Sequence, residues 1–157
     1  MKKIELHNLA EYFGKSLPAG KIKDREIRLA IIRLYGALSK ADKVTASEIE
    51  AIRVKLTEGM EDEVAKYTGL IQKAAAAKGD ELKALLDEAN AMTECVQIDK
   101  DFQESVARLY EEETEVELKK VSLAELYEAL ADCDFPNFTE DCPIGVVAEA
   151  FKLVIND

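Results

Sequence analysis

The stretch DREIRLAIIRLYGALSKADKVTASEIEAIRVKL, from Asp24 to Leu56, contains no proline and decides the fold of this chain. Eight of its apolar residues are separated by three, four or eight positions, which places them on one face of a helix. They are Ile27, Ile31, Leu34, Leu38, Ala41, Ile49, Ile52 and Leu56. A continuous helix of this length would span roughly 50 Å, so we expect the other helices to pack along it.

Local sequence signals mark both ends of this predicted helix and a region in its middle where it could break. Asp24 is suited to cap the first turn of the helix, and Gly59 is suited to follow its end. Asp42, Thr45 and Ser47 are poor residues for a helix interior. Ser47 with Glu50 also has the spacing of a capping box, so the stretch is either one helix or two helices joined near Ala41.

The rest of the chain alternates helical patterns with short extended ones. Residues 4–6 and 96–98 have the alternation of short strands, and so does 114–119, which could pair with 4–6. Helical patterns cover 61–78, 82–92, 102–110, 123–130 and 144–154. We expect Asp80 to cap the helix over 82–92, Asp99 or Asp101 the helix over 102–110, and Ser122 with Glu125 the next one.

These patterns predict a mainly α protein, with a helical bundle or hairpin around the long basic helix over 24–56 and at most a small β element. A chain of 157 residues, 48% of them hydrophobic, is long enough for one core. We expect a single domain over 1–157, with an N-terminal helical hairpin over 24–94 and a smaller C-terminal α/β subdomain over 95–157. Tryptophan is absent, so the core should be aliphatic.

Charge is distributed unevenly along the chain. The net charge is −11, but residues 1–55 carry twelve Lys and Arg against seven Asp and Glu, which is +5. The remaining nine basic and twenty-five acidic residues give −16 for 56–157. The simplest explanation is that acidic helices lie against the basic one; an acidic surface or a basic binding face directed at a partner are the alternatives. An acidic surface repels phosphates, so direct DNA binding is not expected.

Cysteine usage and hydropathy indicate the compartment. The three cysteines, Cys95, Cys133 and Cys142, are an odd number, and no apolar segment follows Met1-Lys2-Lys3. No apolar run is long enough for a transmembrane helix. The sequence therefore predicts a cytoplasmic protein with reduced cysteines and no membrane association.

Few residues have a pattern that points to chemistry. Cys133 and Cys142 flank a loop containing Asp132, Asp134, Glu140 and Asp141, but their separation is wider than in zinc motifs. The acidic run at 111–117 is typical of a solvated face rather than of a catalytic carboxylate pair. Sequence motifs for nucleotide binding, metalloproteases and serine hydrolases are missing. We therefore expect no catalytic residue, no metal, no cofactor and no enzymatic activity.

Charged residues at two places form the predicted interaction face. Its basic members are Lys21, Lys23, Arg25, Arg28 and Arg33, and its acidic members are Glu111, Glu112 and Glu113. His7, the only histidine, is expected at a surface or an interface rather than as a metal ligand.

A Leu17-Pro18 turn leads into a basic helix with Lys21 and Arg28, charged helices follow, and Glu115-Val116-Glu117-Leu118 precedes a short apolar helix. This order of features resembles that of short helical proteins of unassigned function encoded in bacterial phages and prophages. The loop over 132–142 departs from this order, and the resemblance implies no catalytic residue.

The leading functional hypothesis is a non-enzymatic protein-interaction module, an accessory or assembly protein of a phage or prophage. Its partner would be a protein, and a basic surface on that protein is one option. Association of the chain with itself as a homo-oligomer is a separate option. One alternative is an acidic mimic of nucleic acid that inhibits a nucleic-acid-binding protein. The other is a small metal- or thiol-dependent enzyme that uses the loop over 132–142.

Overall fold

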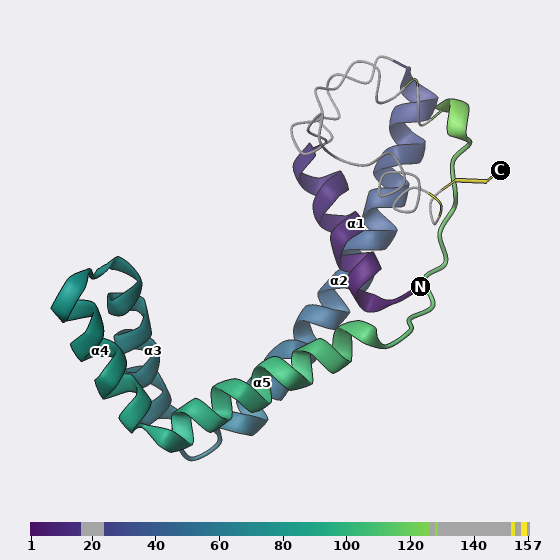
Figure 1. The fold of residues 1–157 in the computed structure, drawn as a ribbon. Coiled ribbons are helices and arrows are strands. Elements are labelled where there is room, and N and C mark those ends of the chain that lie inside the picture. Colours follow the sequence, from purple (N-terminus) through teal and green to yellow (C-terminus); the bar gives the residue numbers. More distant parts are fainter. Residues whose placement is uncertain (17–23, 126–127, 129–151, 153–154, 157) are drawn as a thin grey trace. The chain divides into compact units, whose positions relative to one another are not determined.

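The computed structural model describes residues 1–16, 24–125, 128, 152 and 155–156. These residues form five α-helices, α1 (Lys3–Ser16), α2 (Arg25–Thr57), α3 (Glu61–Ala76), α4 (Gly79–Ala91) and α5 (Thr93–Glu111) (Figure 1). The same residues contain two isolated β-bridges and no named strand. The predicted mainly α fold is confirmed. None of the helices in this described part has the length and apolar character needed to cross a membrane.

The long stretch forms one helix without a break. The Asp24 side chain accepts a hydrogen bond from the Ile27 backbone N–H at 2.9 Å, so the predicted N-cap is confirmed. Thr45 is buried, and Asp42 contacts His7 of α1 instead of capping a new helix. Tertiary packing therefore overrides the low helix propensity of this region. The capping-box pattern of Ser47 and Glu50 does not start a second helix.

The chain divides into two compact units. Unit 1 comprises Met1–Ala46 and Tyr110–Asp157, and unit 2 comprises Ser47–Leu109. Helices α2 and α5 each contribute residues to both units. Compactness does not establish independent folding, so the expected single domain with subdivisions at 24–94 and 95–157 stays a prediction.

The core of unit 1 forms where α1 meets the first half of α2. Buried side chains occur at three- and four-residue spacing on both helices: Leu6, Leu9, Ala10 and Phe13 on α1, and Ile31, Leu34 and Leu38 on α2. Val121 completes this cluster, and Val116 and Leu118 pack against it. As predicted, the core is mainly aliphatic, and it holds α1 against the first half of α2.

Unit 2 contains a helical hairpin of α3 and α4, which pack against each other. Leu70 and Ala74 of α3 and Ala89 of α4 are buried, and Lys66 Nζ lies 3.4 Å from Glu88 Oε1 across the hairpin. Gly59 adopts a φ of 79°, which allows the chain to turn between α2 and α3.

Several boundaries differ from those predicted. Residues 4–6 are helical because Leu6, Leu9 and Phe13 bury one face of α1, so the predicted strand there is wrong. Residues 96–98 lie inside α5, which starts at Thr93; Asp99 and Asp101 are therefore interior residues and not caps. The start of α4 at Gly79 places Asp80 in its first turn and not at its N-cap.

The segment that follows α5 is extended and ends in a capping box. Residues 114–120 have no regular secondary structure, although Lys2 forms an antiparallel bridge with Glu113 and Val121 a parallel one with Ile155. The predicted pairing of 114–119 with 4–6 is therefore wrong. The bridge joins Lys2 to Glu113, which both precede those segments, and residues 4–6 belong to α1. Ser122 and Glu125 exchange reciprocal hydrogen bonds of 2.9 and 3.2 Å, which confirms that capping box. The helix predicted over 144–154 lies outside the described residues, apart from residue 152.

Candidate interaction surface

The predicted basic residues do not form one stripe. Arg25 and Arg33 are exposed on α2, while Arg28 is half-buried, and Arg28 and Arg33 are five positions apart, which separates them around the helix. Among residues the structure describes, none of these three arginines forms an ion pair. The expectation that acidic helices neutralise the basic helix stays a prediction, because part of the acidic half of the chain lies outside the described residues. Lys21 and Lys23 lie outside the described residues.

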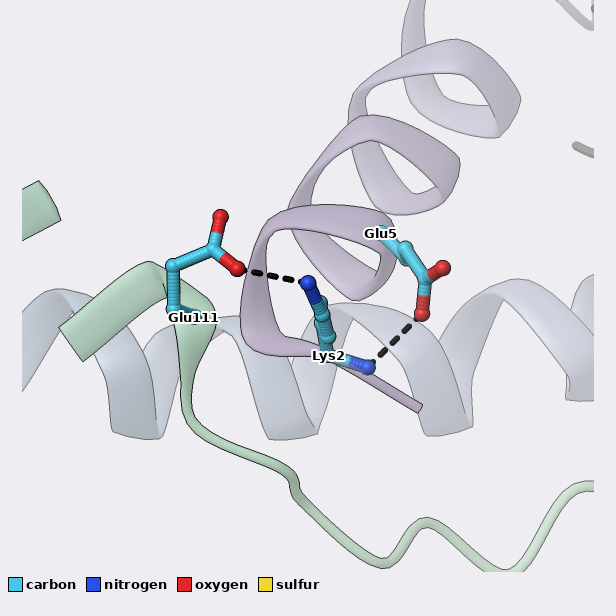
Figure 2. Close-up of polar contacts among 3 residues, drawn as sticks. All are labelled: Lys2, Glu5 and Glu111. Atoms are coloured by element: carbon cyan, nitrogen blue, oxygen red, sulfur yellow. Dashed lines mark hydrogen bonds and ion pairs between the residues drawn. The ribbon is translucent and has the colours of Figure 1, made fainter. Parts of the chain in front are cut away.

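Two of the predicted acidic residues pair with lysines at the start of α1, not with the basic helix. Glu111 Oε2 lies 2.5 Å from Lys2 Nζ, and Lys2 also donates its backbone N–H to Glu5 Oε2 at 2.7 Å (Figure 2). Glu112 Oε2 lies 2.8 Å from Lys3 Nζ. The hydrogen bond and the charge of Glu111 raise the pKa of Lys2, so this lysine stays protonated over the ordinary pH range.

Backbone hydrogen bonds reinforce these ion pairs. The Lys3 N–H donates to the Glu112 carbonyl at 2.9 Å, and the Thr114 N–H donates to the Met1 carbonyl at 2.8 Å. We call residues 1–3 with 111–114 the terminal clamp. Lys3 is buried although it is charged, and its carboxylate partner compensates part of the cost of desolvation. The clamp fixes the point at which the chain leaves α5.

After the clamp, side chains alternate between the core and solvent. Thr114, Val116 and Leu118 are half-buried, and the last two pack against the core of unit 1. Glu113, Glu115 and Glu117 are exposed, as expected when successive residues of an extended chain point in opposite directions. Among the described residues none of these three glutamates has an ion-pair partner. We call these three residues the acidic ridge.

A cavity of about 300 Å³ lies next to the other end of this segment. Its lining includes three cationic side chains, Arg33 of α2 with Lys119 and Lys120. Glu26, Glu125, Ala30 and Val121 complete the lining. The mixture of three cations and two carboxylates leaves only a small positive excess. Arg33 of the predicted basic set therefore lines this cavity together with cations from another segment.

His7 has a structural partner in unit 1. Its Nδ1 lies 3.0 Å from Asp42 Oδ1, and its ring lies 5.6 Å from the ring of Tyr110. Both side chains of the polar pair are partly exposed. This position agrees with the expected location of His7 at a surface or between elements, and it connects α1 with α2.

Unit 2 has a cavity of a different character. It has a volume of about 300 Å³ and is lined mostly by apolar side chains of α2, α3 and α5, among them Leu56, Val64 and Phe102. Arg53 stacks over the Phe102 ring, with 5.3 Å from its guanidinium carbon to the ring centroid. Cys95 lies in the wall and is buried, and this burial raises the pKa of its thiol. A thiol kept protonated is a poor nucleophile.

Metal-ligating side chains do not gather in the part of the chain that can be described. Among those residues no three His, Cys, Asp or Glu side chains lie close enough to hold an ion. Cys133, Cys142 and the loop over 132–142 lie outside this part. The hypothesis of a thiol or metal site in that loop therefore has no support from the described geometry.

Sequence reasoning found part of this surface and missed the rest. The sequence does not point to Lys2 and Lys3, because their contacts with Glu111 and Glu112 join residues more than one hundred positions apart. The alternation over 114–119 is visible in the sequence, but it fits a paired strand equally well. Glu115 and Glu117 could have been found from that same alternation, since it places every second residue in solvent.

Comparison with known proteins adds no assignment. No protein-family model matches the chain, and no match was found to a curated protein or to a solved structure.

Proposed function

We propose that this chain is a non-enzymatic protein-interaction module that presents the acidic ridge to a basic surface on a protein partner. The observation that carries the proposal is the exposure of Glu113, Glu115 and Glu117 on a segment that the terminal clamp holds in place. An accessory or assembly role in a phage or prophage belongs to the same proposal and derives from the order of sequence features alone.

The spacing of the ridge explains why a cationic partner would be favoured. Alternate residues of an extended chain are about 6.6 Å apart, which is shorter than the Debye length of about 10 Å at 0.1 M salt. The three carboxylates therefore repel one another and act together on an approaching charge. Binding a basic surface would relieve this repulsion and would be faster at low salt.

The fixed geometry lowers the cost of recognition. Ion pairs and backbone hydrogen bonds of the clamp hold one end of the ridge, and Val116 and Leu118 anchor the intervening positions on the core. A preformed surface loses less conformational entropy on binding than a mobile segment. The preformed ridge therefore favours a specific contact over general attraction between opposite charges.

The test is capture of a partner with the full chain and a ridge variant. Wild type and the Glu113→Gln, Glu115→Gln, Glu117→Gln triple variant would be immobilised, exposed to lysate and analysed by mass spectrometry. A Glu58→Gln, Glu81→Gln, Asp87→Asn variant changes the net charge equally through exposed residues of unit 2. The proposal expects a protein retained by wild type and by this control but lost from the ridge variant, and then rebound in purified form.

The outcomes are distinct. Equal loss from both variants would show that overall charge, and not the ridge, attracts the protein, and would contradict the proposal. If the partner uses the same basic surface to bind nucleic acid, the acidic mimic of nucleic acid becomes the better description of the module.

A further inference from the structure

The extended segment between the clamp and Val121 has unpaired backbone groups. At one end the Thr114 N–H donates to Met1, and at the other the Val121 carbonyl accepts from the Asn156 N–H at 3.0 Å. Among the residues described, the backbone N–H and C=O groups from 115 to 119 form no hydrogen bond. Five consecutive residues therefore offer the donors and acceptors of a β-strand that has no partner strand within the described part of the chain.

The core holds this segment in one register. Val116 and Leu118 pack on the buried cluster that contains Leu6 and Leu34, and a shift by one residue would place glutamates there instead. Packing of Val116 and Leu118 on the core thus holds the segment in place before any partner arrives, and Figure 1 shows the segment as a coil that continues from α5. An unpaired and preorganised edge is the feature that β-augmentation uses.

The charge pattern selects the occupant of this edge. In paired strands, directly opposite side chains point to the same face with Cβ atoms about 5 Å apart. An antiparallel pairing of two copies centred on this edge would bring acidic ridges together, which is unfavourable. A chain with Lys or Arg at alternate positions would instead place cations opposite Glu115 and Glu117. Its intervening residues would lie beside Val116 and Leu118, where apolar side chains fit.

We infer that residues 113–121 form a docking edge for an extended peptide in which basic and apolar residues alternate. This inference rests on the proposed function, and it specifies how the acidic ridge recognises its partner. Backbone hydrogen bonds to residues 115–119 supply the strand pairing, and the ridge carboxylates select the charge pattern. A basic helix would not satisfy the unpaired backbone groups, since its own N–H and C=O groups are bonded internally.

A synthetic heptapeptide of alternating lysine and valine tests the inference on the full chain. Binding of the fluorescein-labelled peptide would be measured by fluorescence anisotropy, and amide shifts of residues 115–119 by NMR. One control peptide has the same composition with lysines and valines in separate blocks. The other has the alternating sequence with N-methylated valines, which keeps the charge and removes backbone donors.

The inference expects the alternating peptide to bind about tenfold more tightly than either control. The block peptide misplaces lysines relative to Glu115 and Glu117, and the N-methylated peptide loses backbone hydrogen bonds. The Glu115→Gln, Glu117→Gln variant should weaken binding by a similar factor, whereas Glu58→Gln, Glu81→Gln should not. Circular dichroism verifies that each variant remains folded. Equal binding of the N-methylated peptide, or amide shifts outside 113–121, would overturn the inference.

Failure here is distinguishable from failure of the proposed function. If a captured protein needs the ridge carboxylates but the N-methylated peptide binds as well as the alternating one, the ridge recognises charge without strand pairing. The interaction module then stands and the docking edge does not.

Discussion

The Nδ1 atom of His7 lies 3.0 Å from Oδ1 of Asp42, which joins α1 to the middle of α2 within unit 1. Asp42 lies in the region where the sequence allowed a break in the long helix. With its carboxylate in contact with α1, Asp42 does not compete for backbone N–H groups of its own helix. The pair therefore combines a tertiary contact with support for a continuous α2.

A double-mutant cycle measures this contact. We expect His7→Ala and Asp42→Ala to show a coupling free energy of about 0.5–1.5 kcal/mol, the usual net contribution of a hydrogen bond. Urea unfolding of wild type, both single variants and the double variant at neutral pH supplies the four values. Additive effects would mean that the two side chains do not interact in solution.

Leu34 should be essential for the stability of unit 1. Its side chain is 1% exposed in the centre of the core cluster, so Leu34→Ala should lower the free energy of unfolding by about 2–5 kcal/mol. Ile32 of the same helix is 46% exposed, and Ile32→Ala should change it by no more than about 0.5 kcal/mol. Chemical denaturation compares the two variants. If both variants lowered the free energy of unfolding equally, Leu34 would not lie on the buried face of α2.

The success of the sequence analysis for Leu34 and its failure for residues 4–6 have one physical explanation. The long apolar face of α2 repeats over many turns, so local periodicity identifies it. Ile4 and Leu6 form too short a pattern to distinguish a strand from a helix, and packing of Leu6, Leu9 and Phe13 against α2 decides the matter. The terminal clamp was not predictable, because periodicity within a segment does not show which distant segment it contacts.

The capping box at Ser122 predicts a dependence on acidic pH. The hydrogen bond from the Ser122 N–H to the Glu125 carboxylate lowers the pKa of Glu125 below its usual value of 4.5. A lowered pKa in the folded state contributes stability that is present above the unfolded-state pKa. That contribution is lost as pH falls through the folded-state value.

Glu125→Gln isolates this contribution. We expect wild type to be more stable than the variant near neutral pH and the difference to shrink as pH falls below about 4.5. Thermal unfolding across this pH range provides the measurement, with Glu58→Gln as a control for an exposed glutamate. A difference that is independent of pH would show that the capping interaction does not depend on the ionised carboxylate.

Cys95 should resist alkylation in the folded protein. Burial raises the pKa of its thiol above 9.0, so both access and thiolate formation are disfavoured. In a Cys133→Ser, Cys142→Ser background, iodoacetamide should label Cys95 slowly in buffer and rapidly in denaturant. Since the folded-state pKa is raised, the thiol's contribution to stability is present at neutral pH and declines as pH rises above the unfolded-state value. Labelling at the same rate in both conditions would contradict the buried position.

The last prediction concerns duplex DNA and follows from the net charge of −11. Arg25, Arg28 and Arg33 lack ion-pair partners among the described residues, so they could in principle contact phosphates. The acidic residues outnumber them, however, and at low salt their field extends beyond the surface and opposes the approach of DNA. We expect no shift of duplex DNA in a gel at about 50 mM salt, where phosphate contacts are strong. An Arg25→Ala, Arg28→Ala variant serves as the control. A shift with wild type that this variant abolishes would show that the basic residues of α2 bind nucleic acid, and the proposed function would have to be replaced by a nucleic-acid-binding one.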